Sequence, residues 1–132
     1  MATATGRFTV LGGNEESIAE VPDGIRVTRV SGRQRFAGSI EGEGFVDWIF
    51  CYLPDRTARF AGLQRIVGGI DNRSGSLVLQ STGSHDGRQS RGTWRIVPGS
   101  GTGELAGIDG EGSFDAPGGP EVDYTLDYRL PG

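Results

Sequence analysis

The sequence predicts an all-β protein that forms a single eight-stranded antiparallel β-barrel. The first observation is an acidic glycine repeat: residues 40–44 read Ile-Glu-Gly-Glu-Gly, and residues 108–112 repeat the pattern as Ile-Asp-Gly-Glu-Gly. Glycine costs about 1 kcal/mol at each helix position, so neither copy forms a stable helix. Inside a strand, glycine marks a bend or a close backbone approach, and a closed, strongly curved sheet needs such points at several places.

Evenly spaced turn signals are the second observation. Pro54, the pair Asp86-Gly87 and Pro98 are residues that tight turns prefer. The strands predicted around these turns cover residues 6–11, 25–36, 38–53, 57–67, 76–85, 89–97, 102–114 and 122–130, and residues 12–24 are predicted to be a polar connection. Eight strands suffice to close a small barrel around a packed interior or a single small ligand.

The last predicted strand gives the third observation, because its apolar and polar residues alternate. Val122, Tyr124, Leu126, Tyr128 and Leu130 share one face, and the intervening residues are polar. This alternation is typical of a strand with one buried and one solvated face. A chain of 132 residues has room for one core, so we expect one domain spanning residues 1–132.

Composition narrows the classes of function. The net charge of −4 argues against a nucleic-acid partner, and the absence of lysine excludes Schiff-base chemistry. One histidine and one cysteine are too few for a zinc site, so we expect no cofactor and no such metal centre. Residue counts alone leave an all-carboxylate Ca²⁺ or Mg²⁺ site open.

Membrane and export signals are absent from the sequence pattern. No apolar run approaches the ~20 residues of a membrane-spanning helix. The N-terminal residues lack the charged and apolar regions of a signal peptide, and the single Cys51 allows no internal disulfide. We therefore expect a cytoplasmic protein without a membrane partner.

The predicted interior contains several polar side chains. Alternation predicts a mostly apolar cavity that binds substrate, lined by Phe60, Gln64, Gln80, Trp94, Tyr124 and Tyr128. Two amides and two phenols exceed what a sealed core normally tolerates, since each unpaired buried polar group costs ~1–3 kcal/mol. The alternative is a filled barrel in which these groups satisfy one another.

Four residues are candidates for catalysis. Arg29 and Tyr52 are expected to point inward, where they would polarise a carbonyl or stabilise a developing negative charge. Glu15 and Glu20 lie in the polar connection and are the acid–base candidates, because loops at a barrel mouth often carry such groups. His85 is expected at an exposed strand end beside the turn at residues 86–87.

Two other motifs are weaker evidence for a functional site. The carboxylate pairs Glu41/Glu43 and Asp109/Glu111 each share one strand face. Facing inward they would share a proton, but facing outward they are solvated charges, and we favour the outward arrangement because carboxylates are rarely buried unpaired. Residues 101–106 match a dinucleotide-binding fingerprint but lack the helix that holds the pyrophosphate.

The third predicted strand is apolar on both faces. Val46, Trp48, Phe50 and Tyr52 occupy one face, and Phe45, Ile49, Cys51 and Leu53 occupy the other, where Asp47 is the exception. One face lines the barrel, and an exposed patch of the other would be unusual. We therefore expect coverage by the N-terminal segment or by a second subunit, and favour a homodimer.

The second half of the chain resembles a known family. The blocks that carry the resemblance are residues 57–65, 73–80, 91–94, 97–105 and 124–128. They resemble a widespread family of short bacterial proteins named only as a domain of unknown function, and the resemblance implies a calycin-like barrel similar to that of allene oxide cyclases. Those enzymes fold an apolar substrate into a reactive pose without a metal.

The sequence departs from this family pattern at a few positions. His85 stands where the resemblance implies an aromatic residue, Trp48 and Cys51 replace blander residues, and Arg56 stands where the turn normally has glycine. The family supplies no catalytic residues to carry over.

These observations lead to one functional hypothesis and two alternatives. We expect a cofactor-independent isomerase or cyclase acting on a small apolar metabolite inside the barrel, in secondary-metabolite biosynthesis. Holding such a substrate in a reactive pose can itself lower the barrier. The alternatives are a non-catalytic binding or carrier protein for a small lipophilic ligand, and a structural protein with a filled barrel.

Overall fold

Strands make up most of the chain in the computed structural model, which describes residues 1–131 apart from the side chain of Glu20. The strands are β1 (Ala2–Val21), β2 (Ile25–Gly38), β3 (Ile40–Tyr52), β4 (Ala58–Ile70), β5 (Arg73–His85), β6 (Ser90–Ile96), β7 (Thr102–Gly103), β8 (Asp109–Ala116) and β9 (Glu121–Arg129). The one helical element of the described residues is a single 3₁₀ turn, Pro22–Gly24.

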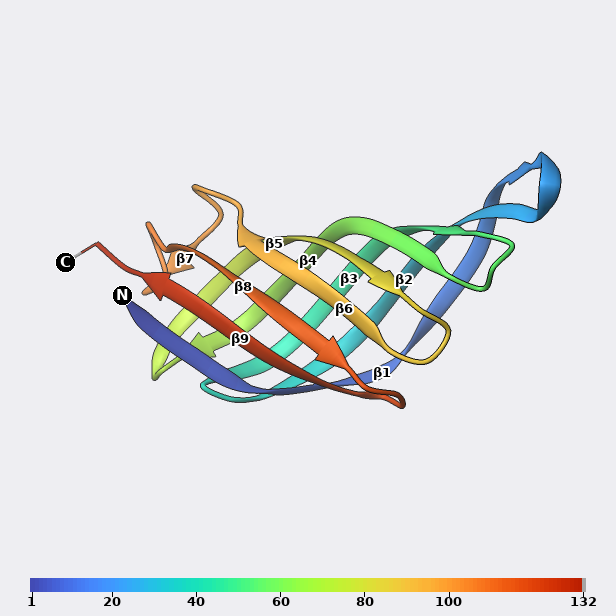
Figure 1. Cartoon of the computed structure of the whole chain (residues 1–132). Coiled ribbons are helices and arrows are strands. Elements are labelled where there is room, and N and C mark those ends of the chain that lie inside the picture. Colours follow the sequence, from blue (N-terminus) through green and yellow to red (C-terminus); the bar gives the residue numbers. More distant parts are fainter. Residues whose placement is uncertain (132) are drawn as a thin grey trace.

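The strands form a closed barrel, as predicted. The order β4-β3-β2-β1-β9-β8-β6-β5 closes on itself through β4–β5 pairing, and every pairing is antiparallel. The two-residue β7 adds to the edge of β5 outside this ring of eight. Figure 1 shows the tilted strands that enclose the interior.

Inward-facing glycines make room for aromatic rings in this interior. A Cβ on Gly62 would overlap Trp48, one on Gly83 would overlap Phe60, and one on Gly92 would overlap the ring of Phe114. Gly44 and Gly6 receive Phe36 and Tyr124 in the same way. A small barrel cannot hold a large side chain at every inward position, and the glycines therefore allow the rings to lie against the wall.

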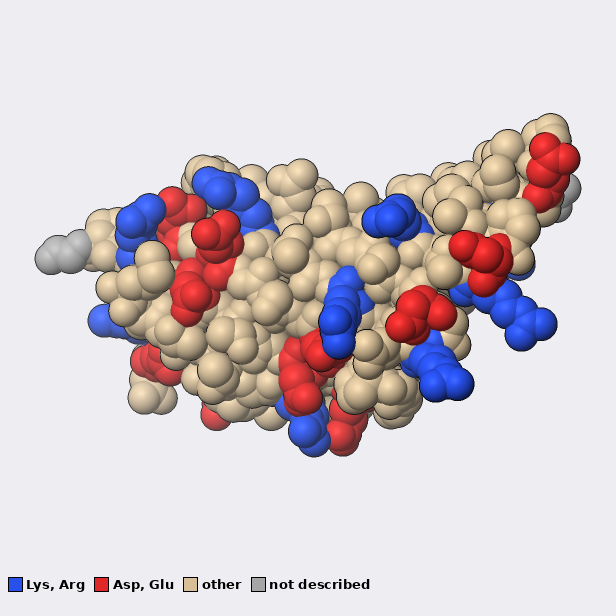
Figure 2. All heavy atoms as spheres, viewed as in Figure 1, with Lys and Arg blue, Asp and Glu red and all other residues tan. Residues whose placement is uncertain are grey.

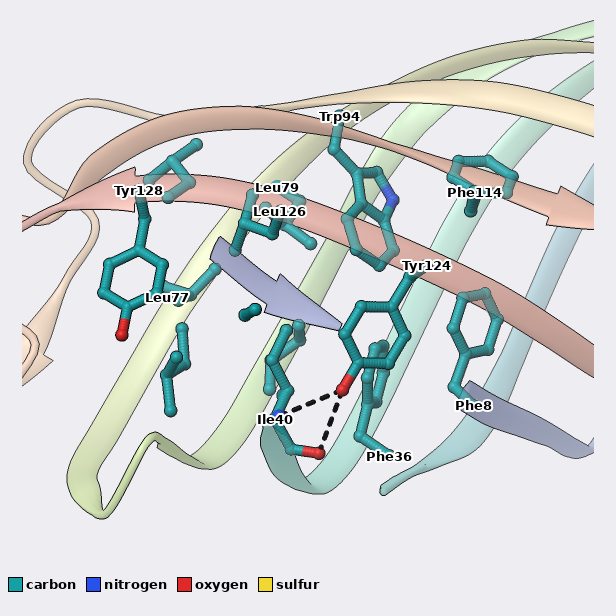
Figure 3. Packing of buried hydrophobic residues seen from close by; sticks show 14 of the residues in the cluster. Phe8, Phe36, Ile40, Leu77, Leu79, Trp94, Phe114, Tyr124, Leu126 and Tyr128 are labelled. Atoms are coloured by element: carbon teal, nitrogen blue, oxygen red, sulfur yellow. Dashed lines mark hydrogen bonds between the residues drawn. The ribbon is translucent and has the colours of Figure 1, made fainter. Parts of the chain in front are cut away.

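Three of the polar side chains predicted to line a cavity, Gln64, Trp94 and Tyr124, find hydrogen-bond partners inside the protein. The Trp94 Nε1–H donates to Gln64 Oε1 at 3.1 Å, and the Gln64 amide nitrogen donates to Gln34 Oε1. The Tyr124 hydroxyl accepts from Ile40 N at 2.9 Å and donates to a nearby backbone oxygen, Ala37 O at 2.8 Å (Figure 3 draws its contacts with Ile40). This part of the barrel is a packed core, and the reasoning that predicted a cavity from unsatisfied amides and phenols was wrong.

The N-terminal region differs most from the prediction. β1 is far longer than residues 6–11, because residues 12–21 continue as a strand that pairs with β2 instead of forming a loop. The β1–β9 pairing ends at Thr9, so the distal parts of β1 and β2 project as a hairpin beyond the end of β9 (Figure 1). We call residues 11–31 the arm.

The other boundaries follow the prediction closely, with one exception. The predicted strand 102–114 is two strands, because residues 104–107 form a turn between β7 and β8. The tight turn after β3 places Arg56 at φ 72°, in the left-handed region that favours glycine. A glycine at this position would therefore relieve the backbone conformation.

Candidate functional site

The arm end of the barrel carries a group of inward-facing side chains that the strand register brings together. Residues directly opposite each other share one face of a sheet, and one such row runs from Glu15 through Val30 and Trp48. A second row contains Thr28, Phe50 and Phe60, and a third contains Arg26, Tyr52, Ala58 and His85. Thr28, Ala58 and Phe60 are buried, which identifies this face as the inner one.

We call eight of these residues the mouth cluster. They share the inner face at the open, one-sided end of the barrel, where the arm extends past β9: Glu15, Arg26, Thr28, Trp48, Phe50, Tyr52, Phe60 and His85. The sequence prediction included Glu15, Tyr52 and Phe60 but missed the importance of Arg26, Thr28 and Phe50. Alternation along β2 and β3 was the signal that could have found them.

Aromatic rings form a column from the rim into the core. Tyr52 stacks on Phe50 with ring centroids 5.7 Å apart, and Phe50 stacks on Phe60 at 4.8 Å. Phe60 stacks on Trp48 at 4.8 Å, and Trp48 lies nearly parallel to Phe114 at 5.9 Å. Tyr52, Phe50 and Trp48 are only half-buried, so the upper part of the column offers aromatic surface to a ligand.

The polar side of the mouth is centred on Glu15. Its Oε2 accepts hydrogen bonds from Tyr52 OH at 2.5 Å and from Thr28 Oγ1 at 2.8 Å. The Arg26 guanidinium lies 3.7 Å from the same oxygen and 5.2 Å from the centroid of the Tyr52 ring. These contacts fix a carboxylate and a phenol side by side at the edge of the aromatic column.

Tyr52 is held as a neutral hydrogen-bond donor. Burial, and then its hydrogen bond to Glu15, raise the pKa of Tyr52 to about 12. A phenol with this pKa donates a hydrogen bond at neutral pH but does not ionise. Tyr52 therefore suits orientation or charge stabilisation, and it is a poor general base.

His85 faces the mouth on the far side from the arm. It is half-buried at the end of β5, and its Nδ1 lies 2.8 Å from Ser90 Oγ. The sequence predicted His85 to be exposed at a strand end; the strand end is correct, but the side chain is half-buried on the inner rim. Histidine is the usual proton carrier near neutral pH, so its position adds a group that could act on a molecule in the mouth.

Two predicted inward residues lie outside the barrel. Arg29 is exposed and makes a two-pronged pair with Asp47, with Nε–Oδ1 at 2.8 Å and Nη2–Oδ2 at 2.6 Å. Gln80 is exposed on the outer face of β5, because Leu77, Leu79 and Ser81 occupy the inner face. Neither side chain reaches the interior, so their predicted inward placement was wrong.

The remaining predicted residues fall into two groups. Phe60, Gln64, Trp94, Tyr124 and Tyr128 are buried as expected, and all but Phe60 belong to the core below the mouth. The Tyr128 hydroxyl donates to Asp71 Oδ2 at the opposite end of the barrel. The side chain of Glu20 lies outside the described part of the structure, and the backbone of this residue is opposite Arg26.

The paired carboxylates face outward, as favoured. Glu41 and Glu111 are exposed, and Glu43 and Asp109 are half-buried and lie near Arg33 at 3.0 Å and Arg129 at 3.7 Å. Within the described residues, no group of three or more histidine, cysteine, aspartate or glutamate side chains could hold a metal ion. No helix in this same part of the chain is long and apolar enough to cross a membrane.

The opposite end of the barrel has a depression of about 680 Å³. It lies at the β2–β3 and β4–β5 turns, and its lining consists of glycines and polar residues, among them Glu41 and Asp71. It lacks the aromatic surface of the mouth. The mouth cluster is therefore the better candidate for a site.

Comparisons with known proteins agree with the fold. A solved structure of a protein of unknown function from Shewanella oneidensis MR-1 superimposes with a TM-score of 0.84 at 26% sequence identity, and the match covers 100% of this chain and 98% of the other. None of the curated proteins compared with the chain matches it. The family model described as "Protein of unknown function (DUF3224)" matches residues 4–128, and the chain is therefore a member of this family.

Proposed function

We propose that the mouth cluster binds a small, mostly apolar molecule with a flat, unsaturated part and one polar group. The observation that carries the proposal is the aromatic column, whose rings pass from half-exposed at Tyr52 and Phe50 to buried at Phe60. Small-ligand sites are mostly apolar, with a few placed polar groups. The column supplies the apolar surface, and Glu15, Tyr52 and Arg26 supply the polar groups.

The mouth cluster also contains a buried donor without a partner. The Nε1–H of Trp48 is buried and has no hydrogen-bond partner among the described residues. Ser81, directly across Gly62 from Trp48 in the register, also has a buried hydroxyl without a partner. Such groups cost about 1–3 kcal/mol each when unsatisfied, and a hydrogen-bond acceptor reaching this place when the mouth is occupied would remove part of the cost.

Binding can be tested with an apolar fluorescent dye, 1-anilinonaphthalene-8-sulfonate. We expect Phe50→Ala to weaken dye binding at least about tenfold, the equivalent of 1.4 kcal/mol. Leu63→Ala is the matched control, because Leu63 is 51% exposed on the outer face of β4, away from the mouth. Unchanged binding in Phe50→Ala, or loss of binding in Leu63→Ala alone, would place the dye elsewhere and overturn the proposal.

A second candidate is the isomerase or cyclase function implied by the resemblance to allene oxide cyclases. The specific observation in its favour is that a carboxylate and an imidazole, Glu15 and His85, both face the mouth. A bound carbonyl compound could lose a proton to His85, and the neutral Tyr52 phenol could stabilise the enolate oxygen once its single O–H turns from Glu15 to the ligand. Isomerisation needs no cofactor, because the proton returns to another carbon of the same molecule.

The two candidates differ in what happens to a bound compound. An isomerase converts a dye-displacing unsaturated ketone or fatty acid to a product of identical mass, which proton NMR distinguishes from the starting compound. Glu15→Gln and His85→Asn should then slow conversion more than they weaken binding. If compounds bind and are recovered unchanged, the protein is a binder or carrier, and if nothing binds, the filled-barrel alternative stands.

A further inference from the structure

The outer face of β3 and β4 is unusually apolar for an exposed surface. Four large side chains on it are 39–51% exposed: Phe45, Ile49, Leu63 and Val67. The register places Phe45 opposite Arg65, Asp47 opposite Leu63, and Ile49 opposite Ala61, so these side chains form one contiguous surface. We call it the β3–β4 patch. By contrast, Figure 2 shows charged side chains of both signs scattered over the face formed by β6, β8 and β9.

The N-terminal segment does not cover this patch. β1 lies in the barrel wall between β2 and β9, so the predicted coverage by the N-terminus was wrong. The largest apolar patch on a typical monomer is roughly 300–600 Å², and patches of this kind are often functional. The half-buried Val27 and Cys51 extend the apolar surface toward the arm.

Charges around the patch are arranged asymmetrically. On the β2 side, Asp47 and Glu43 are paired with Arg29 and Arg33. On the β4 side, Arg59 and Arg65 are exposed and form no ion pair within the described residues. The β3 edge of the patch therefore carries two carboxylates that β2 arginines already pair with, and the β4 edge carries cations that form no ion pair within the described residues.

We propose that the β3–β4 patch is the interface of a homodimer whose two-fold axis runs between β3 and β4, roughly parallel to the strands. Such an axis places β3 of each copy over β4 of the other. Ile49 then packs over the partner's Ala61, and Arg65 lies over the partner's Phe45, between the carboxylates of the partner's Glu43 and Asp47. A two-fold interface uses the same surface on both copies, so it must be self-complementary, and this axis sets apolar side chains against apolar side chains and Arg65 beside carboxylates of the partner.

Face-to-face packing of two sheets is a common arrangement, with mean strand directions within about 30° of each other. The proposed dimer leaves the mouth cluster free, because the mouth cluster lies on the inner face and the patch on the outer face. Dimerisation and ligand binding can therefore succeed or fail independently.

The test is the molar mass in solution, measured by light scattering and sedimentation velocity at up to about 100 µM, a concentration at which a standard interface is occupied. We expect a dimer for the unmodified protein. Ile49→Glu and Leu63→Glu should weaken association at least about tenfold. Ile18→Glu is the matched control, because Ile18 is equally exposed, at 52%, but lies on the arm.

Charge reversal tests the direction of the axis. Arg65→Glu should weaken the dimer, and adding Glu43→Arg should restore it, whereas Arg88→Glu on the β5–β6 turn should have no effect. Circular dichroism verifies that each variant keeps the all-strand spectrum. A monomer at the highest concentration, which would leave the patch to a different protein or a lipid, overturns the proposal. A dimer that persists in both Ile49→Glu and Leu63→Glu, or that ignores Arg65→Glu, also overturns it.

Discussion

Adding one methyl group at Gly92 tests whether the inward-facing glycines of this barrel make room for aromatic rings. A Cβ at this position would lie 2.6 Å from Cε1 and 2.9 Å from Cε2 of Phe114, and real Cβ atoms essentially never come within 3.0 Å of another heavy atom. All three nearest atoms belong to the far end of the Phe114 ring and none to the backbone. Phe114 is 4% exposed and contacts Phe8, Trp48, Phe60 and Trp94, so it has little room to move away.

Overpacking a well-filled core typically costs 1–3 kcal/mol. We therefore expect Gly92→Ala to lower the free energy of unfolding by about 2 kcal/mol, out of the roughly 5–15 kcal/mol of a typical domain. The measurement is guanidinium unfolding followed by tryptophan fluorescence, since Trp48 and Trp94 both lie against the same ring. Unfolding of a single domain of this size is normally two-state, which makes the free energies comparable.

A double-mutant cycle supplies the control. Phe114→Leu removes the end of the ring that the new methyl group would meet, at a cost of its own. In that background Gly92→Ala should cost less than about 0.5 kcal/mol, so the coupling energy should exceed about 1 kcal/mol. An equal cost of Gly92→Ala in both backgrounds would refute the explanation that this glycine exists to accommodate the ring.

Three further perturbations test other parts of the structure. Gln64→Leu leaves the Gln34 amide oxygen and the Trp94 N–H without partners, so it should lower the free energy of unfolding by about 1–3 kcal/mol in a denaturant titration. Adding Gln34→Leu removes one of these unpaired groups and should recover part of the loss. Burial raises the pKa of both Tyr52 and Tyr128 to about 12, above the ordinary value of about 10. The stabilisation linked to these protonated phenols is therefore complete below about pH 10 and is lost as the pH rises toward about 12. Thermal melts across that range should show the loss, and it should be smaller in Tyr52→Phe with Tyr128→Phe. Arg56→Gly relieves a left-handed backbone conformation and should raise the melting temperature by an amount equivalent to about 1 kcal/mol. A neutral or negative change would mean that contacts of the Arg56 side chain stabilise the fold by more than the backbone strain costs.

The local pattern of the sequence predicted the barrel because glycine spacing, turn residues and alternation are local signals. The Asp86-Gly87 turn and the alternation in β9 lie where they were expected. The arm was missed because residues 12–21 contain two glycines and several polar residues and bury little. Their strand conformation comes from pairing with β2, which a local pattern does not reveal.

Face assignment failed where both faces of a strand carry apolar residues. Val78 lies on the outer face and is half-buried because Val97 and Ser100 hydrogen bond to its backbone and cover it. An apolar residue suggests an inner face, so Gln80, which shares the face of Val78, was predicted to point inward. Arg29 was misplaced for a similar reason, since Val27 beside it lies on the outer surface near the β3–β4 patch. In both cases the apolar neighbour lies on the outer face of the barrel.

The cavity prediction failed because partners for buried polar groups come from distant strands. Gln64 in β4 bonds to Gln34 in β2 and to Trp94 in β6, each 30 residues away along the chain. No single strand shows that these three groups meet. Counting buried donors and acceptors therefore overestimates how many are left unsatisfied, unless the register between strands is already known.

The glycines and the mouth are linked by the same rings. Gly62, Gly83 and Gly92 accommodate Trp48, Phe60 and Phe114, and these three rings form the lower part of the aromatic column on which Phe50 and Tyr52 stack. Rings held against the barrel wall cannot readily change rotamer, so the floor of the mouth is fixed before any ligand arrives. A preorganised surface avoids part of the entropy cost of binding. The glycine content that first predicts the fold therefore also gives the candidate site its rigidity, and Gly92→Ala should disturb dye binding at the mouth even though residue 92 does not belong to the mouth cluster.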